Sequence, residues 1–166
     1  ARADGSHSEN TLQKYYPRVG GTHAGHQHTS RCAELDGDGR LTSGRADGEP
    51  INLNDPWYLA RANGVTEAPR TVIGAPNDEN FREMPRCGKK TFCCGAGGGR
   101  MWFEEAPEQR VSKIRAAEAV ATGAETLATG GPVCLTMITD GMASPAGGEE
   151  AKVPATAERL RHRQKR

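Results

Sequence analysis

Large aliphatic side chains are scarce in this sequence. Leu, Ile, Val and Phe account for only 22 of its 166 residues, a share lower than ordinary globular domains have and closer to that of disordered chains. The net charge is only +1, so the chain lacks the high charge that usually accompanies disorder. Length and composition together predict one small domain with a thin hydrophobic core.

Charge of one sign and long apolar runs are also lacking, and we expect no signal peptide. The near-neutral balance gives no electrostatic reason to expect a nucleic-acid partner. No apolar run is long enough to span a bilayer, so we expect membrane contact only indirectly, through a parent protein. The first residues, ARADG, lack the apolar run of a signal peptide. Without a signal, five cysteines indicate a reducing compartment and metal or redox chemistry, and we expect a cytoplasmic location, free or at the cytoplasmic face of a membrane.

The patterning of apolar residues divides the chain into three parts. Residues 1–50 are polar and glycine-rich, with one short helix expected over 11–16. Residues 51–143 alternate strand-like and helix-like segments, which predicts an α/β fold, a small layered sheet with flanking helices. Residues 144–166 form a tail with a basic end.

Turn residues and apolar spacing place the elements of the central part. The expected strands are 51–53 and 126–129, and the expected helices are 57–63, 67–73, 104–122 and 134–142. In the helix 104–122, Glu104 and Glu105 suit the positive N-terminal end and Gly123 suits the stop. Its buried stripe is predicted to be Val111, Ile114, Glu118 and Ala121, widened by Ala117 and Val120.

Two adjacent cysteines, Cys93 and Cys94, precede a glycine run. Successive side chains of an extended backbone point apart, so neighbouring thiolates can reach different irons of one cluster. Gly95, Gly97 and Gly98 have no Cβ, which lets the backbone approach inorganic sulfide and donate N–H groups to it. The segment is therefore a candidate cofactor site.

A third thiol, Cys134, lies at the start of the expected helix 134–142. A helix N-terminus stabilises the thiolate form that metal binding requires. Three thiolates, Cys93, Cys94 and Cys134, can hold an incomplete iron–sulfur cluster, or a zinc ion with a fourth ligand from elsewhere.

The segment 92–105, FCCGAGGGRMWFEE, resembles the signature of CCG-domain proteins, a family that includes heterodisulfide reductase and the iron–sulfur subunit of glycolate oxidase. NDPWYL at 54–59 resembles the family's His-Asp-Pro-Cys-Tyr-Leu, and GPVC at 131–134 resembles its Cys-Pro-x-Cys. The spacing agrees with the family's, because 35 residues lie between the tryptophan and the cysteine pair and 36 between that pair and GPVC.

This resemblance implies an electron-transfer domain of an oxidoreductase that binds an iron–sulfur cluster of 4Fe–4S or non-cubane type. It also implies ferredoxin-like and flavin-containing redox partners or domains. Trp57 and Gly131 stand where the family has ligand cysteines, as does Ser8 in the weaker upstream match, and Cys87 is an extra thiol without a place in the pattern. The alternatives are a degenerate remnant without redox function and a zinc-binding structural or interaction domain.

Two other patterns suggest metal sites more weakly. His23, His26 and His28 have a spacing that suits zinc or nickel, but in a glycine-rich segment we expect a solvent-exposed loop. Residues 34–45 resemble part of a calcium loop. The last position is Arg45, where a bidentate Glu is required, and we therefore expect no calcium site.

Overall fold

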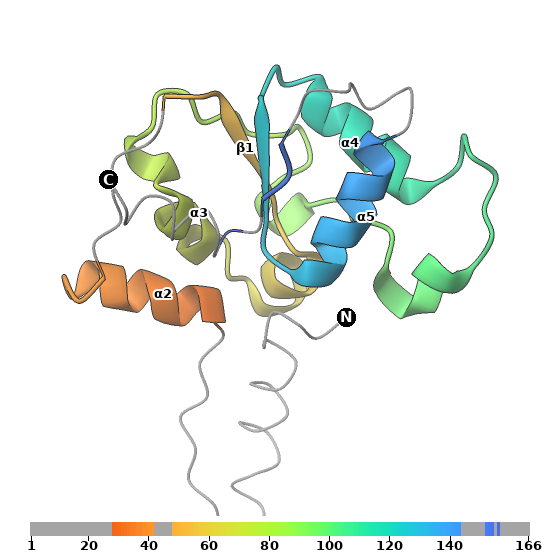
Figure 1. Cartoon of the computed structure of the whole chain (residues 1–166). Helices are drawn as coiled ribbons and strands as arrows, with labels where there is room; N and C mark the ends of the chain where they lie inside the picture. Colours follow the sequence, from red (N-terminus) through yellow and green to blue (C-terminus); the bar gives the residue numbers. More distant parts are fainter. Residues whose placement is uncertain (1–27, 42–47, 144–151, 155, 157–166) are drawn as a thin grey trace, which may run out of the picture.

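A computed structural model gives the fold and describes residues 28–41, 48–143, 152–154 and 156. Two short parallel strands, β1 (Ile51–Asn54) and β2 (Thr126–Thr129), lie between two groups of helices (Figure 1). The helices are α2 (His28–Gly37), α3 (Glu67–Ile73), α4 (Val111–Val120) and α5 (Pro132–Met142). Shorter helical turns are η2 (Tyr58–Ala62), η3 (Ala75–Asn77), η4 (Gly88–Lys90) and η5 (Gly97–Trp102).

The predicted α/β class and both predicted strands are confirmed, although β1 runs one residue further, to Asn54. Both strands are buried along their whole length. Isolated bridges add Phe81 beside β1 and Lys152 beside β2. The expected helix at 11–16 and the basic end of the tail lie outside the described residues.

The two faces of β1 contact different helices. Ile51 and Leu53 belong to an apolar cluster with Ile73, at the end of α3. On the other face, Asn52 donates to the carbonyl of Ala119 at 3.1 Å, and Asn54 accepts from α4. Period-two alternation thus sends one face of the strand to an apolar contact and the other to polar bonds with α4.

The helices following β1 and β2 only partly match prediction. The helix 67–73 is confirmed as α3, and Gly74 ends it in the left-handed region with φ of 77°. The segment 57–63 forms the wide π-type turn η2 instead of a regular α-helix. Helix α5 begins at Pro132, two residues before the expected start, because proline suits the first turn of a helix.

Helix α4 starts at Val111, so the expected start at Glu104 is wrong. Pro107 stands inside the expected helix, where it would remove a backbone hydrogen bond and clash with the preceding turn. Glu105 forms an ion pair with Arg100. Its charge therefore pairs with a residue of the glycine-rich turn η5 and does not stabilise a helix N-terminus.

The predicted buried stripe of this helix is also wrong. Ile114 is 40% exposed, whereas the buried side chains are Ser112, Arg115, Ala116 and Ala119. Arg115 is fully buried and donates to Asn54 Oδ1 at 2.9 Å. That bond holds α4 in a rotation that hydrophobicity alone does not predict.

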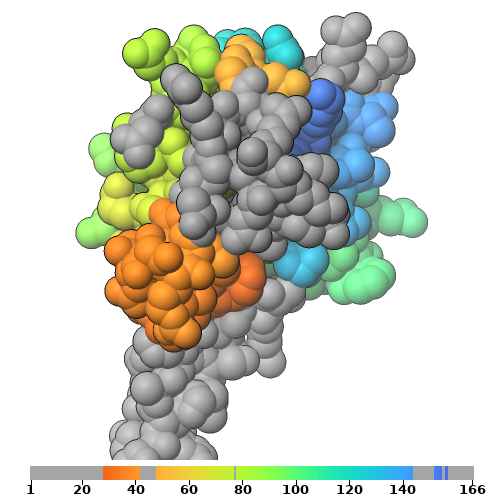
Figure 2. Space-filling model, turned by 60° about the vertical axis from the view of Figure 1, so that its left-hand side comes forward, coloured from red at the N-terminus to blue at the C-terminus, as the bar shows by residue number. Residues whose placement is uncertain are grey.

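Helix α2 was not among the predicted elements. It packs against α3 and lies at the surface, where Figure 2 shows it in orange. None of the helices in the described ranges combines the length and the apolar character needed to cross a membrane.

Candidate functional site

A cavity of about 570 Å³ lies where the two strands end. The loop after β1 brings Pro56 and Trp57 to it, and the loop after β2 brings Gly131. Parallel strands present their carboxyl ends at one edge of a sheet, which is where α/β folds commonly bind ligands. The lining also includes Cys93, Cys94 and Cys134 and the apolar side chains Phe92, Val111 and Val133.

The structure therefore brings together every position that the sequence pattern assigned to a ligand in the central part of the chain. The predicted glycines Gly95, Gly97 and Gly98 line the same cavity. Residues distant in sequence meet there because β1 and β2 pair in parallel register, from Ile51 with Thr126 to Asn54 with Thr129.

The three thiols interact with one another through Cys94. Cys94 hydrogen-bonds with both Cys134 and Cys93 and is buried, while the other two are half-buried. The bond with Cys134 raises the pKa of Cys94 to about 11. The bond with Cys94, together with burial, raises the pKa of Cys93 well above its ordinary value. Ionising one thiol thus disfavours ionising the next, and a bound cation would relieve that repulsion.

Backbone N–H groups of the glycine run point at sulfur. The N–H of Gly95 donates to Cys93 Sγ at 3.3 Å, and the N–H of Gly97 bonds to the same thiol. Gly95 has φ of 97°, and a Cβ there would lie 3.2 Å from the Cβ of Val111. Glycine is required at this position by both backbone conformation and close packing. That these N–H groups reach inorganic sulfide stays a prediction.

Trp57 and Gly131, which stand where the family pattern has cysteines, have different surroundings. Trp57 is 42% exposed, and the guanidinium of Arg61 lies 5.7 Å from its ring centroid. Gly131 has extended backbone with φ of −155°, and no heavy atom lies within 4 Å of an added Cβ. At the neighbouring Gly130, by contrast, a Cβ would lie 2.4 Å from Cγ of Pro56. Packing therefore requires glycine at 130 but not at 131.

The other described thiols lie away from this cavity. Burial and the nearby Glu83 raise the pKa of Cys87, and Cys87 is not part of the cavity lining that the described residues form. Cys32 Sγ lies 3.8 Å from Nε2 of His28 on α2. The rest of the histidine pattern, His23 and His26, and the last residues of the calcium-like loop lie outside the described ranges.

The arrangement of the donor groups bears on the kind of metal centre that they could ligate. Zinc needs about four ligand atoms within about 2.0–2.3 Å of one point, and no three His, Cys, Asp or Glu side chains in the described ranges are grouped to hold one metal ion. An iron–sulfur cluster distributes its cysteine ligands over several irons, so its thiolates need not converge on one point. The mostly apolar lining would also limit access of water to a cluster.

Sequence reasoning missed the residues that hold the cysteine loop in place. Asp55 accepts from Arg70 Nη1 at 2.9 Å and Nη2 at 3.0 Å, and from the N–H of Gly88 at 2.7 Å. Its carbonyl accepts from the hydroxyl of Thr91 at 3.1 Å, two residues before Cys93. The Asp-Pro motif pointed to Asp55, but nothing in the sequence pointed to Arg70.

Comparison with known proteins places the chain among redox proteins. A family model described as a cysteine-rich domain, CCG, matches residues 55–139. An EtfAB:quinone oxidoreductase from Syntrophomonas wolfei is 34% identical over 161 residues, covering 93% of this chain and 22% of that protein. The probable iron-sulfur-binding oxidoreductase FadF from Bacillus subtilis is 34% identical over 154 residues, with the same 93% and 22% coverage.

A third relative is named for a different activity. This protein, a dihydromethanophenazine:CoB–CoM heterodisulfide reductase component from Methanosarcina mazei, is 36% identical over 91 residues, covering 55% of this chain and 22% of the relative. The chain thus spans about a fifth of the length of these relatives. No solved structure matches.

Proposed function

Because this chain belongs to the CCG cysteine-rich domain family, we propose that it is an electron-transfer domain that holds an iron–sulfur cluster on Cys93, Cys94 and Cys134. The observation that carries the proposal is the cavity at the ends of β1 and β2, whose wall contains all three thiols and both positions where the family pattern has further cysteines. Three thiols in one cavity wall, beside backbone N–H donors and apolar side chains, form a set that suits an iron–sulfur cluster.

The chain's own residues would do three things. The three thiolates would ligate iron, and the N–H groups of Gly95 and Gly97 would donate hydrogen bonds to sulfur and thereby stabilise its negative charge. Phe92, Val111 and Val133 would keep water away. A cluster bound in this way supplies one-electron chemistry.

The activity of the whole protein is part of the proposal. The relatives' names include a quinone oxidoreductase and a heterodisulfide reductase, and we propose that this domain serves an oxidoreductase of that kind, with ferredoxin-like and flavin-containing redox partners or domains. We further propose a 4Fe–4S or non-cubane cluster. A cytoplasmic location is proposed because the described cysteines are all free thiols.

Anaerobic reconstitution with iron and sulfide tests the proposal. The protein should bind both elements and show broad visible absorption that dithionite bleaches. Cys93→Ser, Cys94→Ser and Cys134→Ser should each lose most of the bound iron. Cys32→Ser and Cys87→Ser are the matched controls and should retain it. A colourless protein without bound iron would rule out the cluster.

A second candidate, a structural domain without redox function, is favoured by one observation. Positions 57 and 131 carry no sulfur although both line the cavity. Such a domain would bind zinc or no metal at all. One zinc ion per chain, lost in the same cysteine variants, together with failure to assemble a cluster, would support this candidate.

A further inference from the structure

Two arginines and one glutamate form an ion-pair network behind the loop that carries Cys93. Arg115 Nη1 donates to Glu118 Oε2 at 2.8 Å, and Arg86 Nε donates to Glu118 Oε1 at 2.9 Å. The side chain of Arg115 is fully buried, that of Glu118 is 13% exposed, and that of Arg86 is 42% exposed. One carboxylate thus faces two guanidinium groups, which leaves one positive charge without a counter-charge inside the network.

The network contacts the candidate site directly. The guanidinium carbon of Arg86 lies 3.7 Å from the ring centroid of Phe92, which lines the cavity and precedes Cys93. Arg115 donates to the carbonyl of Arg86 at 2.9 Å and to the hydroxyl of Thr91 at 3.3 Å. Both arginines therefore hold the segment that leads into the cysteine pair.

Two other charged residues near the cavity, Arg100 and Asp55, each form an ion pair. Arg100 lines the cavity but pairs with Glu105. Asp55 is matched by Arg70, whose second partner, Glu83, is 41% exposed.

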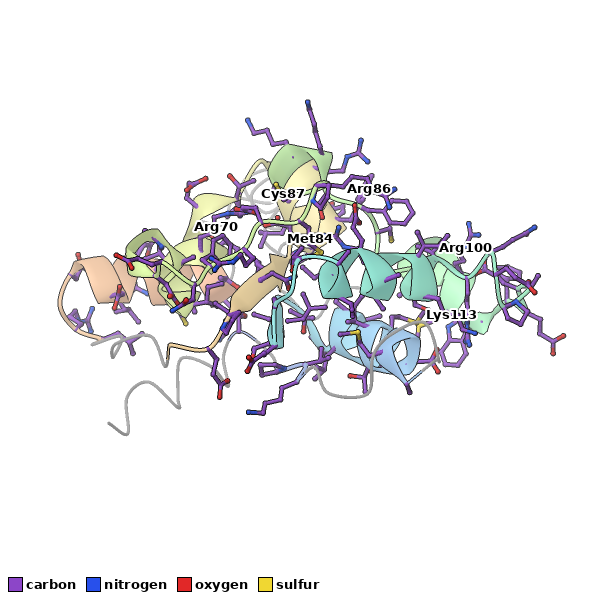
Figure 3. All side chains as sticks on the ribbon, turned by 90° about the horizontal axis from the view of Figure 1, so that it is seen from above. Arg70, Met84, Arg86, Cys87, Arg100 and Lys113 are labelled. Carbon is purple, nitrogen blue, oxygen red and sulfur yellow. The ribbon has the colours of Figure 1, made fainter. Side chains whose placement is uncertain are left out.

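Arg86 lies near a different part of α4 from the other basic residues near the cavity. In Figure 3, Arg86 lies near the C-terminal half of α4, while Lys113 and Arg100 lie toward its N-terminal end. The guanidinium of Arg86 lies over the ring of Phe92, so the uncompensated charge of the network acts from that side.

We propose that the network of Arg86, Glu118 and Arg115 raises the reduction potential of the cluster in this cavity. This inference rests on the proposed function. One-electron reduction adds one negative charge to the cluster, and the positive charge of Arg86, held against the Phe92 ring at the cavity wall, stabilises the reduced form more than the oxidised form. Arg86 and Arg115 are thus positioning residues, which would act on the cluster through charge and through the loop.

Redox titration of the reconstituted full chain, with dithionite as the reductant, tests this. Arg86→Gln removes a positive charge and should lower the midpoint potential, whereas Glu118→Gln removes a negative charge and should raise it. Arg86→Lys keeps the charge and should restore most of the parent potential. Arg82→Gln is the matched control, because Arg82 is exposed and bonds to the carbonyl of Glu79 beside the start of β1. It should leave the potential unchanged.

The opposite signs separate an electrostatic role from a structural one. Both Arg86→Gln and Glu118→Gln remove the charged pair between these two residues, so a loosened loop would shift both potentials in the same direction. Shifts of the same sign, or shifts no larger than that of Arg82→Gln, would overturn the inference. A parent protein that binds no iron and sulfide would overturn the proposed function itself, which is a distinct result. Circular dichroism of the apo variants would confirm that each one folds.

Discussion

At the scale of single residues, Trp57 and Gly131 decide how many ligands this cavity offers. Both line it, and neither supplies sulfur. Gly131 has extended backbone and open space for a Cβ, so cysteine fits there without the strain expected at a positive φ. Trp57 is 42% exposed, so its replacement removes no fully buried side chain from the core.

We therefore expect the double variant Trp57→Cys, Gly131→Cys to bind more iron per chain after reconstitution and to lose it more slowly in air. Each added thiolate supplies a metal–ligand bond, and metal binding energy adds to folding energy. Iron and sulfide analysis before and after timed exposure to oxygen measures the effect.

The controls for this double variant are its apo form and the two single variants. Without a cluster, the stability of the double variant should lie within about 0.5 kcal/mol of the parent, as for most surface changes. Neither single variant should match the double one, because ligands of one cluster act together. If the double variant binds no more iron than the parent, the cavity is not the family's cluster site.

At the scale of elements, α4 shows what the sequence could and could not predict. Residue alternation and turn residues predicted both strands and α3, and Gly74 predicted where α3 ends. The same patterns did not predict the buried face of α4, because the fully buried Arg115 breaks the rule that apolar side chains face inward.

The sequence likewise predicted some residues of the candidate site and missed others. The thiols Cys93, Cys94 and Cys134 are unusual residue types in a recognisable spacing, so the sequence alone predicted that they lie together, as they do in the cavity wall. Their support by Asp55 and Arg115 depends on hydrogen bonds between residues 15 to 61 positions apart. Local sequence patterns carry no signal for such pairings.

The same element gives a pH prediction. Burial opposes the charge of Glu118, but hydrogen bonds from Arg86 and Arg115 outweigh it and hold the pKa of this carboxyl below its ordinary value. A depressed pKa stabilises the folded state above the unfolded pKa, near pH 4.5, and this stabilisation is lost as the pH falls through the folded value. Glu118→Gln should therefore cost about 1–3 kcal/mol at pH 7 in the apo protein.

Urea unfolding of the apo protein between pH 7 and pH 3 measures that difference. The gap between parent and Glu118→Gln should narrow steadily below about pH 4.5. Glu108→Gln is a suitable control, because Glu108 is an exposed residue in the turn before α4. A gap that stays constant across this range would show that the carboxylate charge does not stabilise the fold.

At the scale of the whole molecule, the core is assembled from small and flexible side chains. The larger apolar cluster, between α4, α5 and β2, contains Met84, Met137 and Met142 with several alanines. Methionine fills gaps but specifies packing weakly, and alanine buries little surface. Cys94 belongs to this same cluster, so a ligand of the proposed cofactor is also a core residue.

Loading the cavity should therefore change the unfolding of the entire domain. We expect the apo protein to unfold over a broad thermal transition, because few large side chains are locked in place. With a cluster bound, Cys93 and Cys94 would be tied to Cys134 on α5, which joins the glycine-rich loop to the core across about 40 residues of chain. The transition should sharpen, and its midpoint should rise by about 5 °C or more. For a chain of this size, about 1 kcal/mol of added stability raises the midpoint by about 2–4 °C.

Anaerobic calorimetry of the apo and the reconstituted protein measures the width and the midpoint of the transition. Cys134→Ser should abolish the rise in the midpoint, whereas Cys32→Ser should preserve it. An apo transition as sharp and as high as that of the reconstituted protein would mean that the core is complete without the cofactor.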